Sequence, residues 1–201
     1  MASAYPNFGP LYAILHLDWG SALIGAVQET PEEQALITNY TRWNNAVHQK
    51  IPRPVTIFTT LAFSQGQPEV KTNTPFANLI APFGAFETGT PEVQIDSRFT
   101  LDEKDLVFPK KRWSATTGNA LEHTLKSQKI NTVVIVSDLE PPFGRLFDLD
   151  YRIYVIADNV LDLPVHQNAE FKKVIIDSLL PKMNLDVISL EEALQALEQS
   201  A

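Results

Sequence analysis

Short apolar runs recur along the chain and predict the strands of a sheet. The run at residues 11–17, LYAILHL, is nearly continuous, which is typical of a strand that is covered on both faces in a parallel sheet. Five further runs have the length and β-branched character of strands. They lie at residues 55–60, 106–108, 132–136, 152–157 and 186–188.

Amphipathic segments separate most of these runs and predict helices. A threonine N-cap, Thr30, precedes Pro31, and apolar residues at helical spacing follow, so residues 31–50 form an amphipathic helix. Further helices are expected at residues 117–128, at residues 164–180 and after the capping box Ser189…Glu192. Strands that alternate with helices indicate an α/β fold, a three-layer α/β/α arrangement around a mostly parallel, Rossmann-like sheet of about six strands.

One long segment interrupts this alternation. Residues 61–105 are rich in Gly, Pro, Thr and Phe and show little periodicity, apart from a short helical turn expected near residues 75–79. Connections of this length are often lids or binding loops, and an irregular surface excursion is the alternative. A length of 201 residues suits a single domain, so we expect residues 1–201 to form one domain with this loop near its pocket.

Composition excludes several kinds of chemistry. The net charge of −8 makes nucleic acid an unexpected partner, and the absence of cysteine excludes disulfides, zinc–thiolate sites and a cysteine nucleophile. The four histidines show no ligand spacing and no nucleotide-binding glycine motif is present, so neither a metal nor a cofactor is predicted. Without an apolar run long enough to span a bilayer, or a leader, we expect a soluble cytoplasmic protein with no membrane partner.

Polar residues that directly follow strands are the candidates for a site, because ligands of open parallel sheets bind beyond the carboxyl ends of the strands. Each candidate also has a plain structural explanation, since such an acid is often a cap or turn residue and neighbouring cations often form a solvated cluster. The candidates are Asp18 after the first strand, Lys110, Lys111 and Arg112 after the strand at 106–108, and Ser137, Asp138 and Glu140 after the strand at 132–136.

Three stretches of the sequence resemble the isochorismatase-like cysteine hydrolases. AILHLDWGSALIG is similar to that family's first strand with its aspartate, although Gly20 stands where a glutamine is usual. The block from GTPEVQ to VVIVS, with its K-x-R-x-S-A motif, and the segment DYRIYVIADNVLD are similar to the family's later parts. The resemblance implies the isochorismatase-like fold, a homo-oligomer, most often a dimer or tetramer, and catalytic roles for Asp18 and Lys110.

The family's third catalytic residue, a cysteine, has no counterpart in this chain. It would lie a few residues after the strand at 132–136, in a segment that is about five residues shorter here and that contains Pro141 and Pro142. Each proline lacks an N–H group, so an oxyanion hole built from backbone donors would also be weakened. Covalent catalysis by cysteine is therefore excluded.

Two functions remain open. In the first, Asp18 is a general acid and Lys110 holds a substrate carboxylate or developing negative charge, as the resemblance to isochorismatases implies for enol-ether hydrolysis. Isomerisation, dehydration or cyclisation would use the same pair. The expected ligand is a carboxylated small molecule, bound by Trp19, Trp113, Ser137, Asp138, Glu140 and phenylalanines of the long loop.

In the second function that remains open, the protein keeps the fold as a catalytically inactive pseudoenzyme and acts as a binding, regulatory or scaffold protein. Ser137 as a replacement nucleophile is a third and weaker possibility, because no histidine is identifiable as its base.

Overall fold

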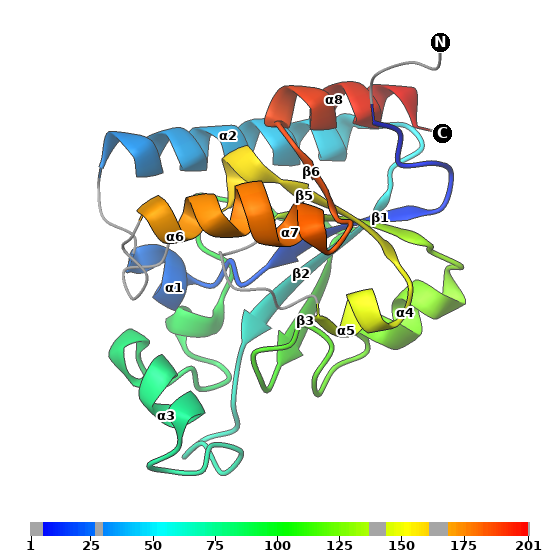
Figure 1. Ribbon diagram of the computed structural model, residues 1–201. Coiled ribbons are helices and arrows are strands. Elements are labelled where there is room, and N and C mark those ends of the chain that lie inside the picture. Colours follow the sequence, from blue (N-terminus) through cyan, green and yellow to red (C-terminus); the bar gives the residue numbers. More distant parts are fainter. Residues whose placement is uncertain (1–5, 27–29, 137–143, 161–168, 201) are drawn as a thin grey trace.

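A single sheet of six parallel strands forms the centre of the protein (Figure 1). The computed structural model describes residues 6–26, 30–136, 144–160 and 169–200. The strands are β1 (Tyr12–Leu17), β2 (Val55–Leu61), β3 (Leu106–Lys110), β4 (Thr132–Val136), β5 (Arg152–Ile156) and β6 (Asp186–Ile188). The order across the sheet is β3-β2-β1-β4-β5-β6, so the predicted α/β fold and parallel sheet are confirmed.

The strand order places a topological switch point beside β1. The chain first moves from β1 through β2 to β3 at one edge, and then returns to β4 on the other side of β1. Because every pairing is parallel, the carboxyl ends of all six strands share one edge of the sheet. In folds of this kind the crevice for ligands opens at that edge, next to the switch point.

Helices cover both faces of the sheet. They are α1 (Ser21–Gly25), α2 (Pro31–Gln49), α3 (Pro75–Ile80), α4 (Leu121–Ser127), α5 (Gly144–Asp148), α6 (Ala169–Val174), α7 (Leu180–Lys182) and α8 (Leu190–Gln199). α2 and α8 lie side by side over one face, and α4, α5 and the α6–α7 segment pack on the other (Figure 1). No helix in the described part of the chain is long and apolar enough to cross a membrane.

Alternation along β1 divides the core into two layers. Ile14 belongs to the cluster that contains Trp43 of α2 and Leu197 of α8, whereas its neighbour Leu15 belongs to the cluster that contains Leu125 of α4. Burial of both faces explains why this strand reads as a continuous apolar run.

A buried histidine connects the sheet to α2. The His16 ring stacks on Phe58 with centroids 4.3 Å apart, and its Nδ1 shares a 2.8 Å hydrogen bond with the Tyr40 hydroxyl. Complete burial, with the charge of His48 as a smaller cause, lowers the pKa of His16 to about 3. The imidazole is therefore neutral at physiological pH and acts as a packing and hydrogen-bonding group of the core.

Most of the predicted elements are confirmed within a few residues, and the turn expected near residues 75–79 is α3. The helix expected from residue 117 begins only at Leu121, after a series of turns. For the helix predicted at 164–180, residues 164–168 lie outside the described residues, and the remainder contains a π-helical turn at Ile175–Leu179. The sequence pattern did not reveal α1 and α5, because each spans only five residues, too few to show helical periodicity.

The capping box of α8 gives a direct test of the C-terminal layer. The Ser189 hydroxyl accepts a hydrogen bond from the Glu192 N–H, and the Glu192 carboxylate accepts one from the Ser189 N–H. We expect Ser189→Ala to lower the free energy of unfolding by about 1 kcal/mol, because a helix N–H loses its acceptor. Urea denaturation measures this change.

Ser127→Ala is the matched control, because the Ser127 hydroxyl donates to the Thr124 carbonyl at the C-terminal end of α4 and caps no N–H group. Its effect should stay below about 0.5 kcal/mol. Equal losses in the two variants would contradict the capping role of Ser189.

Candidate active site

Asp18 directly follows β1 and has an unusual backbone conformation. Its φ of 68° lies in the left-handed region, which few residues other than glycine adopt and which aspartate tolerates better than most. The Asp18 N–H donates to the carbonyl oxygen of Thr59 at 3.1 Å and lies 3.3 Å from the Thr59 hydroxyl, both on the neighbouring strand β2. These contacts hold the chain end of β1 in place, with the Asp18 residue only 3% exposed.

Lys110 is the last residue of β3 and lies opposite Leu61 of β2 in the sheet register. It is 1% exposed, and its Nζ donates to Asp18 Oδ2 at 2.6 Å. A second hydrogen bond, also 2.6 Å long, goes to the carbonyl oxygen of Trp113, and the ammonium lies 5.6 Å from the centre of the Trp113 ring. The ion pair thus joins the ends of β1 and β3 across the end of β2.

The two oxygens of Asp18 have different surroundings. Oδ2 accepts from Lys110, whereas Oδ1 is buried and has no hydrogen-bond partner among the residues that the structure describes. Burial raises the pKa of Asp18 above its usual 3.8, and the charge and hydrogen bond of Lys110 offset part of this increase. The site therefore holds a desolvated carboxyl group with one fixed oxygen and one free oxygen.

A small apolar cavity adjoins this pair. Its volume is about 20 Å³, which leaves room for about one water molecule. Apart from Asp18 and Lys110, the described residues that line it are apolar or aromatic: they are Leu23 of α1, Leu61 of β2, Trp113, and Ile80, Phe83 and Phe86 of the excursion between β2 and β3. The long segment expected near the pocket therefore supplies one wall of it.

The base of this excursion is fixed to the end of β3. The Glu69 carboxylate accepts hydrogen bonds from the Ser64 N–H and hydroxyl, and pairs with Lys111 Nζ at 3.0 Å. Arg112 donates to the Glu69 carbonyl oxygen at 2.8 Å and lies over the Phe76 ring. Lys110, Lys111 and Arg112 are therefore not a free solvated cluster: the first is buried in the site and the other two hold the excursion.

The structure brings together only some of the predicted site residues. Asp18, Lys110 and Trp113 line one cavity. Trp19 does not line it; its ring packs 3.8 Å from Tyr40 and edge-on to Phe99, and its indole N–H donates to the Val136 carbonyl. Ser137, Asp138 and Glu140 lie outside the described residues, so their contact with a substrate stays a prediction.

Sequence reasoning missed the aliphatic walls and one polar contact. Leu23 belongs to the short helix α1, and Ile80 to a segment without long periodicity, so no pattern marked either as a wall. The hydrogen bond from Lys110 to the Trp113 carbonyl is a backbone contact, which side-chain motifs do not report. Only the spacing of three residues between them is visible in the sequence.

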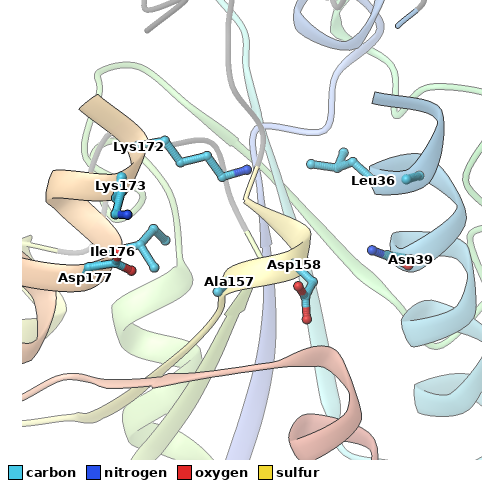
Figure 2. A pocket seen from close by; sticks show the side chains of 9 residues that line it. Leu36, Asn39, Ala157, Asp158, Lys172, Lys173, Ile176 and Asp177 are labelled. Atoms are coloured by element: carbon cyan, nitrogen blue, oxygen red, sulfur yellow. The ribbon is translucent and has the colours of Figure 1, made fainter. Parts of the chain in front are cut away.

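A second hollow lies further along the same edge of the sheet (Figure 2). It has a volume of about 410 Å³, with Leu36 and Asn39 of α2 on one side and Lys172, Lys173 and Asp177 on the other. Two of its charged groups bind the backbone: Lys172 donates to the Val160 carbonyl, and Asp158 accepts from the Leu190 N–H. Among the described residues, no three His, Asp or Glu side chains gather to hold a metal ion.

A comparison with models of known protein families shows to which family this chain belongs. Its sequence matches the isochorismatase domain over residues 12–136. The chain belongs to the isochorismatase family. Among proteins with curated descriptions, no sequence matches it significantly.

Several solved structures share the fold of this chain at low sequence identity. An isochorismatase family protein from Burkholderia thailandensis has a TM-score of 0.76 at 17% identity, covering 97% of this chain and 100% of that one. A cysteine hydrolase from Pseudomonas syringae pv. phaseolicola has a TM-score of 0.79 at 10% identity, covering 99% of both chains. An N-carbamoylsarcosine amidase from Thermoplasma acidophilum has a TM-score of 0.69 at 15% identity, covering 90% and 97%.

The buried ion pair predicts a strongly non-additive double-mutant cycle. Lys110→Met leaves the Asp18 carboxylate buried without its partner, so we expect unfolding to become easier by about 3–5 kcal/mol. In the double variant Asp18→Asn/Lys110→Met no charge is stranded, and its cost should fall at least about 1 kcal/mol below the sum of the single variants. Urea denaturation of all four proteins measures the coupling.

Lys111→Met is the control for removal of a lysine at this end of β3. Its pair with Glu69 is partly exposed to solvent, so its loss should cost no more than about 1 kcal/mol. Additive effects of Asp18→Asn and Lys110→Met would show that the two charges do not stabilise each other in solution.

Proposed function

We propose that this isochorismatase-family protein is an enzyme that acts by non-covalent general acid/base catalysis, with Asp18 as the acid. The observation that carries the proposal is the free, buried Oδ1 of Asp18 on the cavity, while Lys110 holds Oδ2. At rest the Asp18 carboxylate pairs with Lys110, and burial, which raises the pKa of Asp18, makes the protonated form that donates the proton easier to reach. Because the chain contains no cysteine, the thiol chemistry of cysteine hydrolases is not open to it.

Hydrolysis of an enol ether, or of a similar bond, fits these groups. Asp18 transfers its proton to the alkene carbon, which leaves an oxocarbenium ion at the ether carbon. Water adds to that carbon and returns a proton to the Asp18 carboxylate, and the resulting hemiacetal separates into a carbonyl compound and an alcohol. The cavity has room for about one water molecule, and Lys110 stabilises the carboxylate after it has lost the proton.

Other reactions of the same class use the same proton transfer. Isomerisation, dehydration and cyclisation each need a shielded acid that gives and takes back a proton, and Asp18 with Lys110 could supply it.

A non-catalytic role is the second candidate. A volume of about 20 Å³ next to Asp18 is far below that of ordinary substrate pockets, which favours a binding, regulatory or scaffold protein that keeps the fold without turnover. Retention of a costly buried ion pair favours the enzyme, because apolar residues would fill the same space at no loss of stability.

Turnover of a simple vinyl ether tests the proposal. We expect wild-type protein to release acetaldehyde from ethyl vinyl ether faster than buffer does, and Asp18→Asn to lose at least about 100-fold of this rate, because an amide cannot donate the proton. The rate should fall as pH rises through the pKa of Asp18, with a midpoint above 3.8, since the carboxyl group must be protonated. Acetaldehyde is measured by NMR.

Asp177→Asn is the matched control, because Asp177 lies at the second hollow and does not line the cavity of Asp18. Circular dichroism must show that both variants are folded under the assay conditions. If folded Asp18→Asn turns over as fast as wild type, Asp18 is not the acid. A wild-type rate equal to that of buffer for vinyl ethers and for the other reaction classes would favour the non-catalytic protein.

A further inference from the structure

The charges at the cavity balance one another. Among the described residues, Asp18 and Lys110 are the only charged ones that line it, and they form an ion pair 2.6 Å long. Of the three N–H groups that a lysine ammonium carries, one is directed at Asp18 Oδ2 and one at the Trp113 carbonyl oxygen. Lys110 is thus neutralised and largely saturated with hydrogen bonds before any ligand enters.

The two cations that follow in sequence have other partners as well. Lys111 pairs with the Glu69 carboxylate, and Arg112 donates to the carbonyl oxygens of Lys111 and Glu69. Neither residue lines the cavity. A substrate carboxylate that entered there would place a second anion beside Asp18 in an apolar surrounding. No free cation lines the described part of the cavity to balance it, so its entry is strongly unfavourable.

The walls separate into a buried part and a part that faces solvent. Leu23, Leu61, Ile80 and Phe86 are between 2% and 7% exposed. Phe83 and Trp113 are only partly buried, so these two aromatic side chains stand between the cavity and solvent. Phe83 ends the short helical turn after α3 and precedes Gly84, whose φ of 116° is accessible mainly to glycine.

We propose that the site takes a small, uncharged substrate whose reacting end is apolar. Because the closed cavity holds only about one water molecule, the Phe83 side chain moves aside to admit that end and limits its size. The inference rests on the proposed function of Asp18 and names the substrate class for it. It replaces the carboxylated ligand that the sequence led us to expect, because the lysine that would hold such a group is already paired.

A pair of matched probes tests the charge preference. Isobutyramide and isobutyrate have nearly the same shape and differ in charge. Their dissociation constants are measured by NMR titration, in which the signal of the Trp113 indole N–H reports binding. The variant Trp113→Phe identifies that signal. We expect the wild-type protein to bind the amide at least about 10-fold more tightly than the carboxylate, because only the carboxylate adds a second buried anion. Tighter binding of isobutyrate by the wild type would overturn the proposal.

Asp18→Asn should reverse this preference. The substitution removes the negative charge and leaves Lys110 without a counterion, so isobutyrate should gain at least about 10-fold in affinity while isobutyramide changes little. Asp177→Asn, remote from the cavity, should bind both probes as the wild type does. If folded Asp18→Asn still rejects isobutyrate, the ion pair does not set the charge preference and the inference fails.

Phe83→Ala tests the size limit. Removal of this ring enlarges an apolar cavity, and apolar cavities of about 150 Å³ hold benzene-sized molecules. We expect Phe83→Ala to bind benzamide at least about 10-fold more tightly than the wild type does, with benzoate still excluded. Phe147→Ala is the matched control, since Phe147 lies on α5, is 41% exposed and does not line this cavity.

The binding experiments test the ligand class and the turnover experiment tests the reaction, so either can fail while the other holds. A protein that selects amides but hydrolyses no vinyl ether would retain the inferred ligand class and lose the proposed reaction. A protein that hydrolyses ethyl vinyl ether through Asp18 but binds isobutyrate as well as isobutyramide would retain the reaction and lose the ligand class. If neither the wild type nor Phe83→Ala binds either amide, the cavity is no substrate site and the inference is overturned.

Discussion

The ion pair between Asp18 and Lys110 is the contact on which the carboxyl edge of the sheet depends. Its partners are 92 positions apart in sequence, and they meet only because β2 pairs with β1 on one side and with β3 on the other in the observed register. A shift of either strand by one residue would leave two charges buried apart from each other, at a cost of several kcal/mol. Correct pairing of three strands and assembly of the site are therefore a single event.

The sequence predicted the sheet well, because strands buried on both faces carry a signal that depends on few other residues. Asp18 was predictable for the same reason, since it directly follows such a strand. Lys110 was predictable because it ends the short apolar run of β3, an edge strand, and parallel pairing brings the strand ends together. The family resemblance gave the two residues their expected roles, and the fold provides the proximity that those roles require.

The walls of the cavity were not predictable in the same way. Trp19 and Trp113 each stand within three positions of a charged site residue, and the sequence assigned both to the pocket. The chain direction at Trp19 depends on the left-handed conformation of Asp18, a backbone property that no hydrophobic pattern reports, and the indole packs in the core instead. Ile80 and Phe86 reach the cavity through the path of an irregular segment, which is determined by tertiary contacts and not by local periodicity.

The walls of the cavity and its charged pair come from different parts of the chain, and the excursion between β2 and β3 supplies much of the wall. Its base is held by Glu69, Lys111 and Arg112, while Ile80, Phe83 and Phe86 near its far end supply the wall. Asp18 and Lys110 lie at the ends of β1 and β3, and the hydrogen bonds of Lys110 go to Asp18 and to the Trp113 carbonyl, not to those three side chains. Natural variation or design that replaces these wall residues would therefore change which molecules fit the cavity and leave the ion pair of Asp18 and Lys110 in place.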